Sequence, residues 1–131
     1  MKLIQKAVIK KGDKFLIQLR SPQAKYFPLH WDLPGGKLEQ DEDPLIGITR
    51  EIKEETDLDT KLIKVIGVFE LDLDNEGHNS HRFTIYLSEI ISGEVKLSFE
   101  HLEQKWATKE EILKLPIEPY FIPLFEKLSH E

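Results

Sequence analysis

The first twenty positions of the chain contain two short runs of apolar and polar residues, separated by Gly12 and Asp13. Phe15, Ile17 and Leu19 recur at every second position, a period typical of a β-strand with one buried face. The pattern predicts two strands, over residues 2–10 and 14–20. The prolines and glycine that follow predict a loop over residues 21–35, which includes a short extended piece at 31–33.

The pattern then changes to the period of a helix. Asp43 followed by Pro44 is typical of an N-cap and a first helical residue, so we expect a helix over about residues 44–56. Apolar residues at three- and four-residue steps give this helix one stripe that can pack on a sheet. The stripe consists of Leu45, Ile48 and Ile52.

The second half of the chain returns to β-rich runs before it ends in helices. Two long runs are expected over about 61–73 and 81–91, and two short strands at 94–98 and 104–107. Thr108 and Glu111 form a capping-box pattern for a short helix. A last helix is expected to begin at Pro119, with Tyr120, Leu124 and Leu128 facing inward.

This order of elements predicts the α/β (α+β) class, with a mixed sheet between helices. The 131 residues are the length of one ordinary domain, so we expect a single domain over residues 1–131. No apolar run has the length of a membrane span, and the first residues lack the pattern of a signal peptide, so the expected location is cytoplasmic without membrane partners.

The composition of the chain argues against several classes of function. The formal net charge of −6 provides no basic footprint for nucleic-acid binding. The chain has no cysteine, which excludes disulfides, thiolate nucleophiles and zinc sites built on cysteine. The sequence leaves open whether the protein forms a homodimer.

Three glutamates gather on the predicted helix beside its apolar stripe. Glu51, Glu54 and Glu55 are three and four residues apart or adjacent, so their carboxylates lie close together and repel one another. One interpretation is a solvated acidic face, as on many helices. The other is a site for a hard divalent cation such as Mg²⁺, which prefers oxygen ligands and shares its site with phosphates.

The spacing around these glutamates favours the cation site. Residues 36–58 read GKLEQDEDPLIGITREIKEETDL, with Gly36, Glu42, Arg50 and the glutamates at fixed intervals. This stretch resembles the Nudix box, G-x5-E-x7-R-E-U-x-E-E-x-G-U, in which U is a bulky aliphatic residue. Asp57 replaces the last glycine of that pattern. Aspartate is one of the few residues that tolerate the left-handed backbone needed after a helix, so the turn is expected to be kept.

The resemblance to the Nudix hydrolases implies an α/β/α sandwich and Mg²⁺- or Mn²⁺-dependent cleavage of a diphosphate bond in a nucleotide. The run Trp31–Lys37 is similar to MutT-type members, which hydrolyse nucleoside triphosphates. Hydrolysis of ADP-ribose or of a dinucleoside polyphosphate is an alternative. A module that senses nucleotides without catalysis, and an acidic interaction domain whose motif arose by chance, are further alternatives.

Position by position, the resemblance assigns roles to the residues of the box. Glu54 and Glu55 become metal ligands, together with the carbonyl of Gly36. Glu51 is either a further ligand or the base that orients the attacking water. Arg50 holds the glutamates in place through charge-assisted hydrogen bonds.

Further candidate site residues lie outside the box. Glu100 and Glu103 are each either a further metal ligand, as later acidic residues are in many members, or a surface glutamate. Arg20 and Lys37 are cations near the expected phosphate path. Glu118 lies in a segment similar to the one with which animal oxidised-purine triphosphatases read the base, although Ile117 replaces a second acid there.

Overall fold

The computed structural model describes residues 1–75, 77, 80–95 and 101–128 of the chain. Strand β1 (Lys2–Lys11) is central, and β6 (His81–Ser92) runs parallel to it from Lys2 to Lys10. The remaining pairings are antiparallel, and β5 (Asp59–Leu71) forms the edge beyond β6. The sheet is therefore mixed, as predicted.

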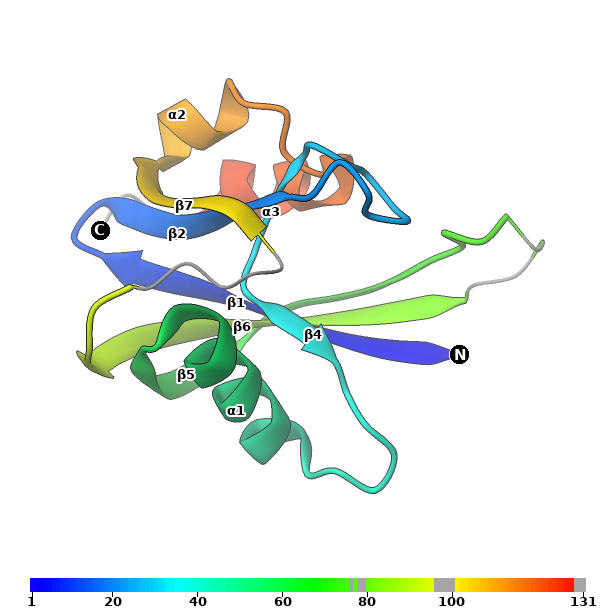
Figure 1. Cartoon of the computed structure of the whole chain (residues 1–131), viewed down its shortest axis with the longest axis horizontal. Helices are drawn as coiled ribbons and strands as arrows, with labels where there is room; N and C mark the ends of the chain where they lie inside the picture. Colours follow the sequence, from blue (N-terminus) through cyan, green and yellow to red (C-terminus); the bar gives the residue numbers. More distant parts are fainter. Residues whose placement is uncertain (76, 78–79, 96–100, 129–131) are drawn as a thin grey trace.

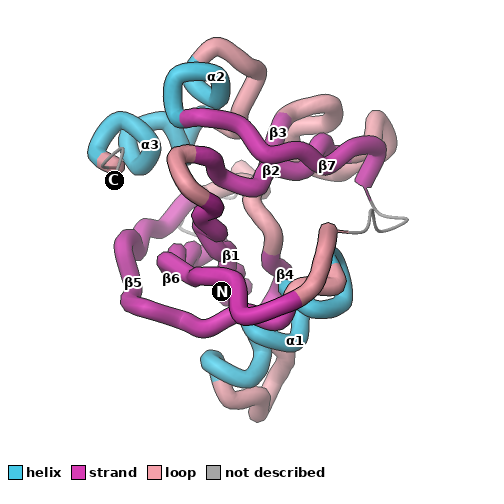
Figure 2. The backbone as a smooth tube through the Cα atoms, turned by 90° about the vertical axis from the view of Figure 1, so that its left-hand side faces the viewer, coloured by secondary structure: helices cyan, strands magenta, loops and turns pink. Residues whose placement is uncertain are grey.

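Strand β1 has different neighbours along its other side. Its first half pairs with β4 (Gly35–Lys37), whereas Lys10 and Lys11 pair with β2 (Lys14–Arg20). Beyond β2 lie β3 (Trp31–Asp32) and β7 (His101–Thr108). Figure 2 shows the two groups of strands separating from β1.

Helices cover the sheet on both sides, which confirms the predicted α/β/α sandwich (Figure 1). One side carries α1 (Pro44–Thr56). The other carries α2 (Lys109–Leu113), α3 (Ile122–Lys127) and the 3₁₀ turn η1 (Pro119–Phe121). No helix among the described residues is long and apolar enough to cross a membrane.

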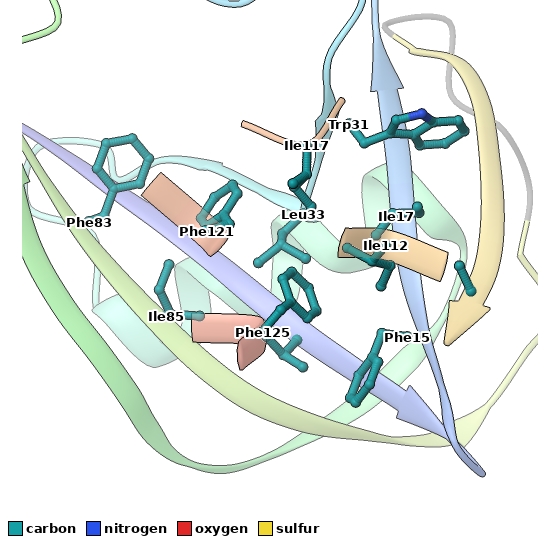
Figure 3. Packing of buried hydrophobic residues seen from close by; sticks show 12 residues of the cluster. Phe15, Ile17, Trp31, Leu33, Phe83, Ile85, Ile112, Ile117, Phe121 and Phe125 are labelled. Carbon is teal, nitrogen blue, oxygen red and sulfur yellow. The ribbon is translucent and has the colours of Figure 1, made fainter. Parts of the chain in front are cut away.

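Each side of the sheet has its own apolar core because alternate residues of β1 face opposite ways. Ala7 and Ile9 pack with Ile48 and Ile52 of α1. On the other side Val8 belongs to a larger, aromatic-rich core. Figure 3 shows Phe121, Phe125 and Leu33 gathered over β1 in this second core.

The caps predicted for the helices are present. The Asp43 side chain accepts hydrogen bonds from the N–H groups of Leu45 and Ile46, and Thr108 and Glu111 form a capping box. Asp57 ends α1 with φ 64° and ψ 15°, the left-handed conformation expected of it.

Several details of the predicted elements were wrong. Leu45 is 57% exposed rather than packed on the sheet, because the first turn of α1 is exposed and burial begins at Gly47. Strand β4 was not predicted. Residues 94 and 95 form no strand, residues 96–98 lie outside the described residues, and β7 is longer than the predicted 104–107.

The predicted inward face of the last helix was only partly correct, because Tyr120, Leu124 and Leu128 pack against the core but are not its most buried residues. Tyr120, Leu124 and Leu128 are only partly buried, whereas Phe121 and Phe125 are fully buried. The segment begins as a 3₁₀ turn and becomes α-helical only at Ile122. The change in residues per turn displaces the inward face by one position.

Candidate active site

Arg50 lies at the centre of a group of glutamates on α1 and the preceding loop. Its guanidinium contacts a carboxylate oxygen of Glu42 at 2.9 Å, of Glu54 at 3.1 Å and of Glu51 at 3.3 Å. We call these four residues the Arg50 cluster. The hydrogen bonds to Glu42 and Glu54 raise the pKa of Arg50. One planar cation thus holds three carboxylates in a fixed arrangement.

Glu55 points away from this cluster and into the protein. Its side chain is buried, and one carboxylate oxygen accepts a hydrogen bond from the N–H of Gly35 at 3.1 Å. Burial raises the pKa of Glu55 to about 8. The carboxylate therefore lies where additional positive charge would stabilise its ionised form.

Two glycines let β4 approach these side chains closely. A Cβ atom at Gly36 would lie 2.9 Å from Oε2 of Glu51. Gly35 has φ +146°, and a Cβ atom there would collide with the backbone carbonyl of Gln5 on β1. Glycine at both positions brings the β4 backbone, with the Gly36 carbonyl, against the glutamates of α1.

The chemistry of these groups fits a hard divalent cation. The predicted ligands offer only oxygen atoms, which Mg²⁺ and Mn²⁺ prefer. The raised pKa of Glu55 shows a buried acid short of positive charge. In the described part of the chain, however, no three His, Cys, Asp or Glu side chains are already gathered as a metal cage.

A cavity of about 310 Å³ opens beside the Gly36 and Glu55 side of this site, where β1, β2 and β4 diverge. Apolar and aromatic side chains form part of its wall, including Ile4, Phe83 and Tyr120. Charged groups form the rest. This large share of charged groups is unusual, because apolar groups usually dominate the wall of a ligand pocket.

Four of these charged residues form a buried group that we call the Asp32 network. Oδ2 of Asp32 accepts hydrogen bonds from Lys6 Nζ and from Arg20 Nη1, both at 2.9 Å. Glu118 is the fourth member, with Oε1 4.0 Å from Arg20 Nε. Burial opposes ionisation of Asp32, but Lys6 and Arg20 outweigh it and hold the pKa of Asp32 well below its usual range.

Glu118 is held in the opposite state. Burial, with the Asp32 carboxylate nearby, raises its pKa to about 9. The Tyr120 hydroxyl donates a hydrogen bond of 2.6 Å to Oε1 of Glu118. Oε2 is buried and has no hydrogen-bond partner among the described residues. The cavity wall thus contains a neutral carboxyl beside the ionised carboxylate of Asp32.

The structure brings together some of the predicted residues and separates others. Arg20 and Glu118 both line the cavity, but exposed Lys37 does not. Glu103 is exposed on β7, next to Gln104, whose amide donates to the carbonyl of Glu55 at 2.9 Å. Glu100 lies outside the described residues, so its part in metal binding stays a prediction, as does that of Glu103.

Sequence reasoning missed Lys6, Asp32 and His81, all of which line the cavity. A signal existed for Lys6, since it stands between Ile4 and Val8 in an apolar row of alternating β1 residues. The sequence around His81 offered no such signal. In the structure His81 is buried, and burial lowers its pKa. Phe83 and Tyr120 belong to the aromatic core and also line the cavity.

Comparison with known proteins places this geometry in a family. The family model described as the NUDIX domain matches residues 6–128. A CTP pyrophosphohydrolase of Escherichia coli is 28% identical over 96% of this chain and 91% of its own length. A mouse bis(5'-nucleosyl)-tetraphosphatase (asymmetrical) is 28% identical over 86% of this chain and 79% of its own length.

A solved structure agrees with the family match and with the two relatives. The crystal structure of a MutT protein from Methanosarcina mazei Go1 is 29% identical and superposes with a TM-score of 0.80, covering 96% of this chain and 91% of that one. The family match spans nearly all of the chain, including the Arg50 cluster and the Asp32 network. The chain belongs to the NUDIX family of hydrolases, which act on phosphoanhydride bonds.

Proposed function

We propose that the protein is a metal-dependent pyrophosphohydrolase that cleaves the diphosphate linkage of a nucleoside triphosphate or of a related nucleotide. The observation that carries this proposal is the position of the cavity. Gly36 and Glu55, from the predicted metal site, line the same cavity as the aromatic and charged residues around Glu118. A single nucleotide can therefore place its phosphates at the metal site and its nucleoside beside Glu118.

Glu51, Glu54, Glu55 and the carbonyl of Gly36 are the groups that we propose to hold Mg²⁺ or Mn²⁺. The bound cation would neutralise charge on the phosphate oxygens during the attack of water on phosphorus. Arg50 would keep Glu51 and Glu54 in position, as its hydrogen bonds already do. For a triphosphate, attack at the α-phosphorus releases a nucleoside monophosphate and pyrophosphate, and Glu51 is proposed as ligand or base.

Arg20 and Glu118 are proposed to bind the substrate inside the cavity. Arg20 offers guanidinium N–H groups to oxygen atoms of the nucleotide. Neutral Glu118 can donate a hydrogen bond as well as accept one, because its pKa is raised to about 9. The CTP pyrophosphohydrolase and the tetraphosphatase, which match 96% and 86% of this chain, are named for nucleotide substrates, so CTP is the first triphosphate to test.

The decisive experiment is an assay with Mg²⁺ across nucleoside triphosphates, oxidised nucleotides, ADP-ribose and dinucleoside polyphosphates, with identification of the products. Glu54→Gln is the test variant, because Glu54 is 58% exposed and its loss should leave the fold intact. We expect activity to fall by about 100-fold or more, beyond the effect usual for groups that only support a metal ligand. Glu126→Gln, on exposed α3, is the matched control.

Metal-dependent hydrolysis that disappears in Glu54→Gln and persists in Glu126→Gln would support the proposal and name the substrate class. Equal activity in Glu54→Gln and the wild type would contradict the metal site. No hydrolysis of any substrate, combined with a nucleotide-dependent rise in thermal stability, would instead favour a nucleotide-sensing module, since only ligands that bind the native state raise its stability.

A further inference from the structure

Lys6 occupies a position that packing alone would assign to an apolar residue. It lies in the middle of central strand β1, between Ile4 and Val8 on the face that packs against the aromatic core. Only 8% of Lys6 is exposed. Burying an ammonium group is costly even when it is paired, and apolar residues of similar volume are often as stable or more stable. Lys6 therefore has a weak structural rationale at this position.

The surroundings of Lys6 leave positive charge in excess at the cavity wall. Lys6 Nζ and Arg20 Nη1 converge on the same oxygen, Oδ2 of Asp32, at 2.9 Å each. The second oxygen of Asp32 already accepts the N–H of Leu33 at 2.7 Å. Two cations thus share one carboxylate, and the neighbouring acid Glu118 is held neutral by burial.

The Lys6 ammonium also retains unused donors. An ammonium group has three N–H bonds. Among the described residues, Lys6 Nζ makes one hydrogen bond, to Asp32. Both Lys6 and Arg20 line the cavity of about 310 Å³, so a ligand there meets two cations with free N–H groups. Such a pair is suited to an anionic oxygen.

The position of the pair identifies which part of a nucleotide it meets. Gly36 and Glu55 line the cavity toward the predicted metal site, and Glu118 and Phe83 line it toward the proposed nucleoside position. Lys6 is the register partner of Gly35 in β4, and its Nζ shares Asp32 with Arg20, which lies 4.0 Å from Glu118. Lys6 therefore lies between the two regions. The phosphate attached to the nucleoside is the group that must lie between them.

We propose that Lys6 and Arg20 form a cation pair, held together by Asp32, that binds an oxygen of the phosphate attached to the nucleoside. This inference rests on the proposed function for the placement of the nucleotide. It assigns Lys6 a direct contact with substrate and gives Asp32 the task of positioning both cations.

Binding of nucleoside monophosphates without Mg²⁺ tests the pair separately from hydrolysis. Isothermal titration would compare AMP, GMP, CMP and UMP with the corresponding nucleosides. For the preferred base, we expect the monophosphate to bind the wild type at least about 10-fold more tightly than the nucleoside, as for charge-assisted hydrogen bonds to phosphate. Lys6→Met should lose this difference, and Lys6→Arg should keep most of it.

Lys10→Met is the matched control. Lys10 lies on the same strand but lines no part of this cavity. The phosphate-dependent gain, meaning the tighter binding of the monophosphate than of the nucleoside, should therefore be the same in Lys10→Met as in the wild type. If Lys6→Met does not fold, Lys6→Gln replaces it, because the amide still donates to Asp32 without a charge. Circular dichroism and thermal melting would establish the folded state of each variant.

Two results would overturn the inference: a wild type that binds monophosphates no more tightly than nucleosides, or a folded Lys6→Met or Lys6→Gln variant that keeps the phosphate-dependent gain. The proposed function fails by a different result, the absence of Mg²⁺-dependent hydrolysis. A protein that binds monophosphates through Lys6 but hydrolyses nothing would therefore retain the cation pair and lose the enzyme assignment.

Discussion

The Arg50 cluster and the Asp32 network both combine cations with carboxylates, yet they are built in different ways. The Arg50 side chain is 36% exposed and Glu54 is 58% exposed, so water screens their interaction. Asp32 and Glu118 are 1% and 2% exposed, so water does not screen the interaction between them and their pKa values move in opposite directions. Charge in the first region can be removed at little cost to folding, whereas charge in the second is part of the folded structure.

The largest effect on stability should come from a substitution in the Asp32 network. Asp32→Asn removes the carboxylate that holds Lys6 and Arg20, and it leaves the buried Lys6 and the partly buried Arg20 without this partner. We expect the free energy of unfolding to fall by about 3–5 kcal/mol, as when one partner of a buried ion pair is lost. Urea denaturation at pH 7 measures the change.

The double variant Lys6→Met with Asp32→Asn sharpens this test. It removes one cation together with the anion, so part of the lost stability should return. If Asp32→Asn alone is as stable as the wild type, the network contributes nothing to folding and the contrast with the Arg50 cluster is lost.

The exposed region should show the reverse behaviour, a large effect on activity and a small one on stability. Arg50→Lys keeps the charge but cannot contact Glu42, Glu51 and Glu54 at once, because an ammonium is a single point donor. We expect kcat to fall by about 10- to 100-fold, the usual effect of losing a group that orients metal ligands.

Stability of Arg50→Lys should change by no more than about 1 kcal/mol, because partly exposed ion pairs contribute little. Steady-state kinetics and thermal melting on the same preparation measure both quantities. Arg82→Lys is the control, since Arg82 forms a similarly exposed ion pair with Glu70 on the far strands. A drop in stability without a drop in kcat would reverse the assignment of the two regions.

The same contrast explains what the sequence could predict. The Arg50 cluster lies within residues 42–54, on α1 and the loop just before it. Helical spacing brings Arg50, Glu51 and Glu54 together, and the spacing of the Nudix box identified Glu42, so these residues were found before the structure. The Asp32 network draws Lys6 from β1, Arg20 from β2, Asp32 from β3 and Glu118 from the segment before η1. Residues so far apart in the chain meet only through the register of the sheet, which no local pattern specifies.

The secondary structure shows the same difference between features set by local sequence and features set by tertiary packing. Strands β1 and β2 and helix α1 have strong local signals and lie where expected. Strand β4 has only three residues, two of them glycine, and forms because β1 pairs with it. The exposed first turn of α1 and the displaced inward face of the last helix likewise depend on tertiary packing, which local periodicity does not include.

The smallest predicted effect concerns the proton on Glu118. Below its ordinary pKa of 4.5, this group is protonated in the native and the unfolded states alike. Between 4.5 and about 9 the unfolded state releases the proton and the native state keeps it, so this group lowers the stability of the protein as pH rises. Glu118→Gln cannot ionise and should remove this contribution. At pH 8 the variant should be more stable than the wild type by at least about 1 kcal/mol.

The difference between Glu118→Gln and the wild type should shrink toward pH 4.5, as followed by urea denaturation at several pH values. The buried acid Glu55 contributes a slope of the same sign, so some pH dependence should remain in the variant. Glu126→Gln, outside the network, should follow the wild-type curve. Parallel curves for Glu118→Gln and the wild type would mean that native Glu118 is ionised, in which case Lys6 and Arg20 face two carboxylates and the excess positive charge at the cavity wall disappears.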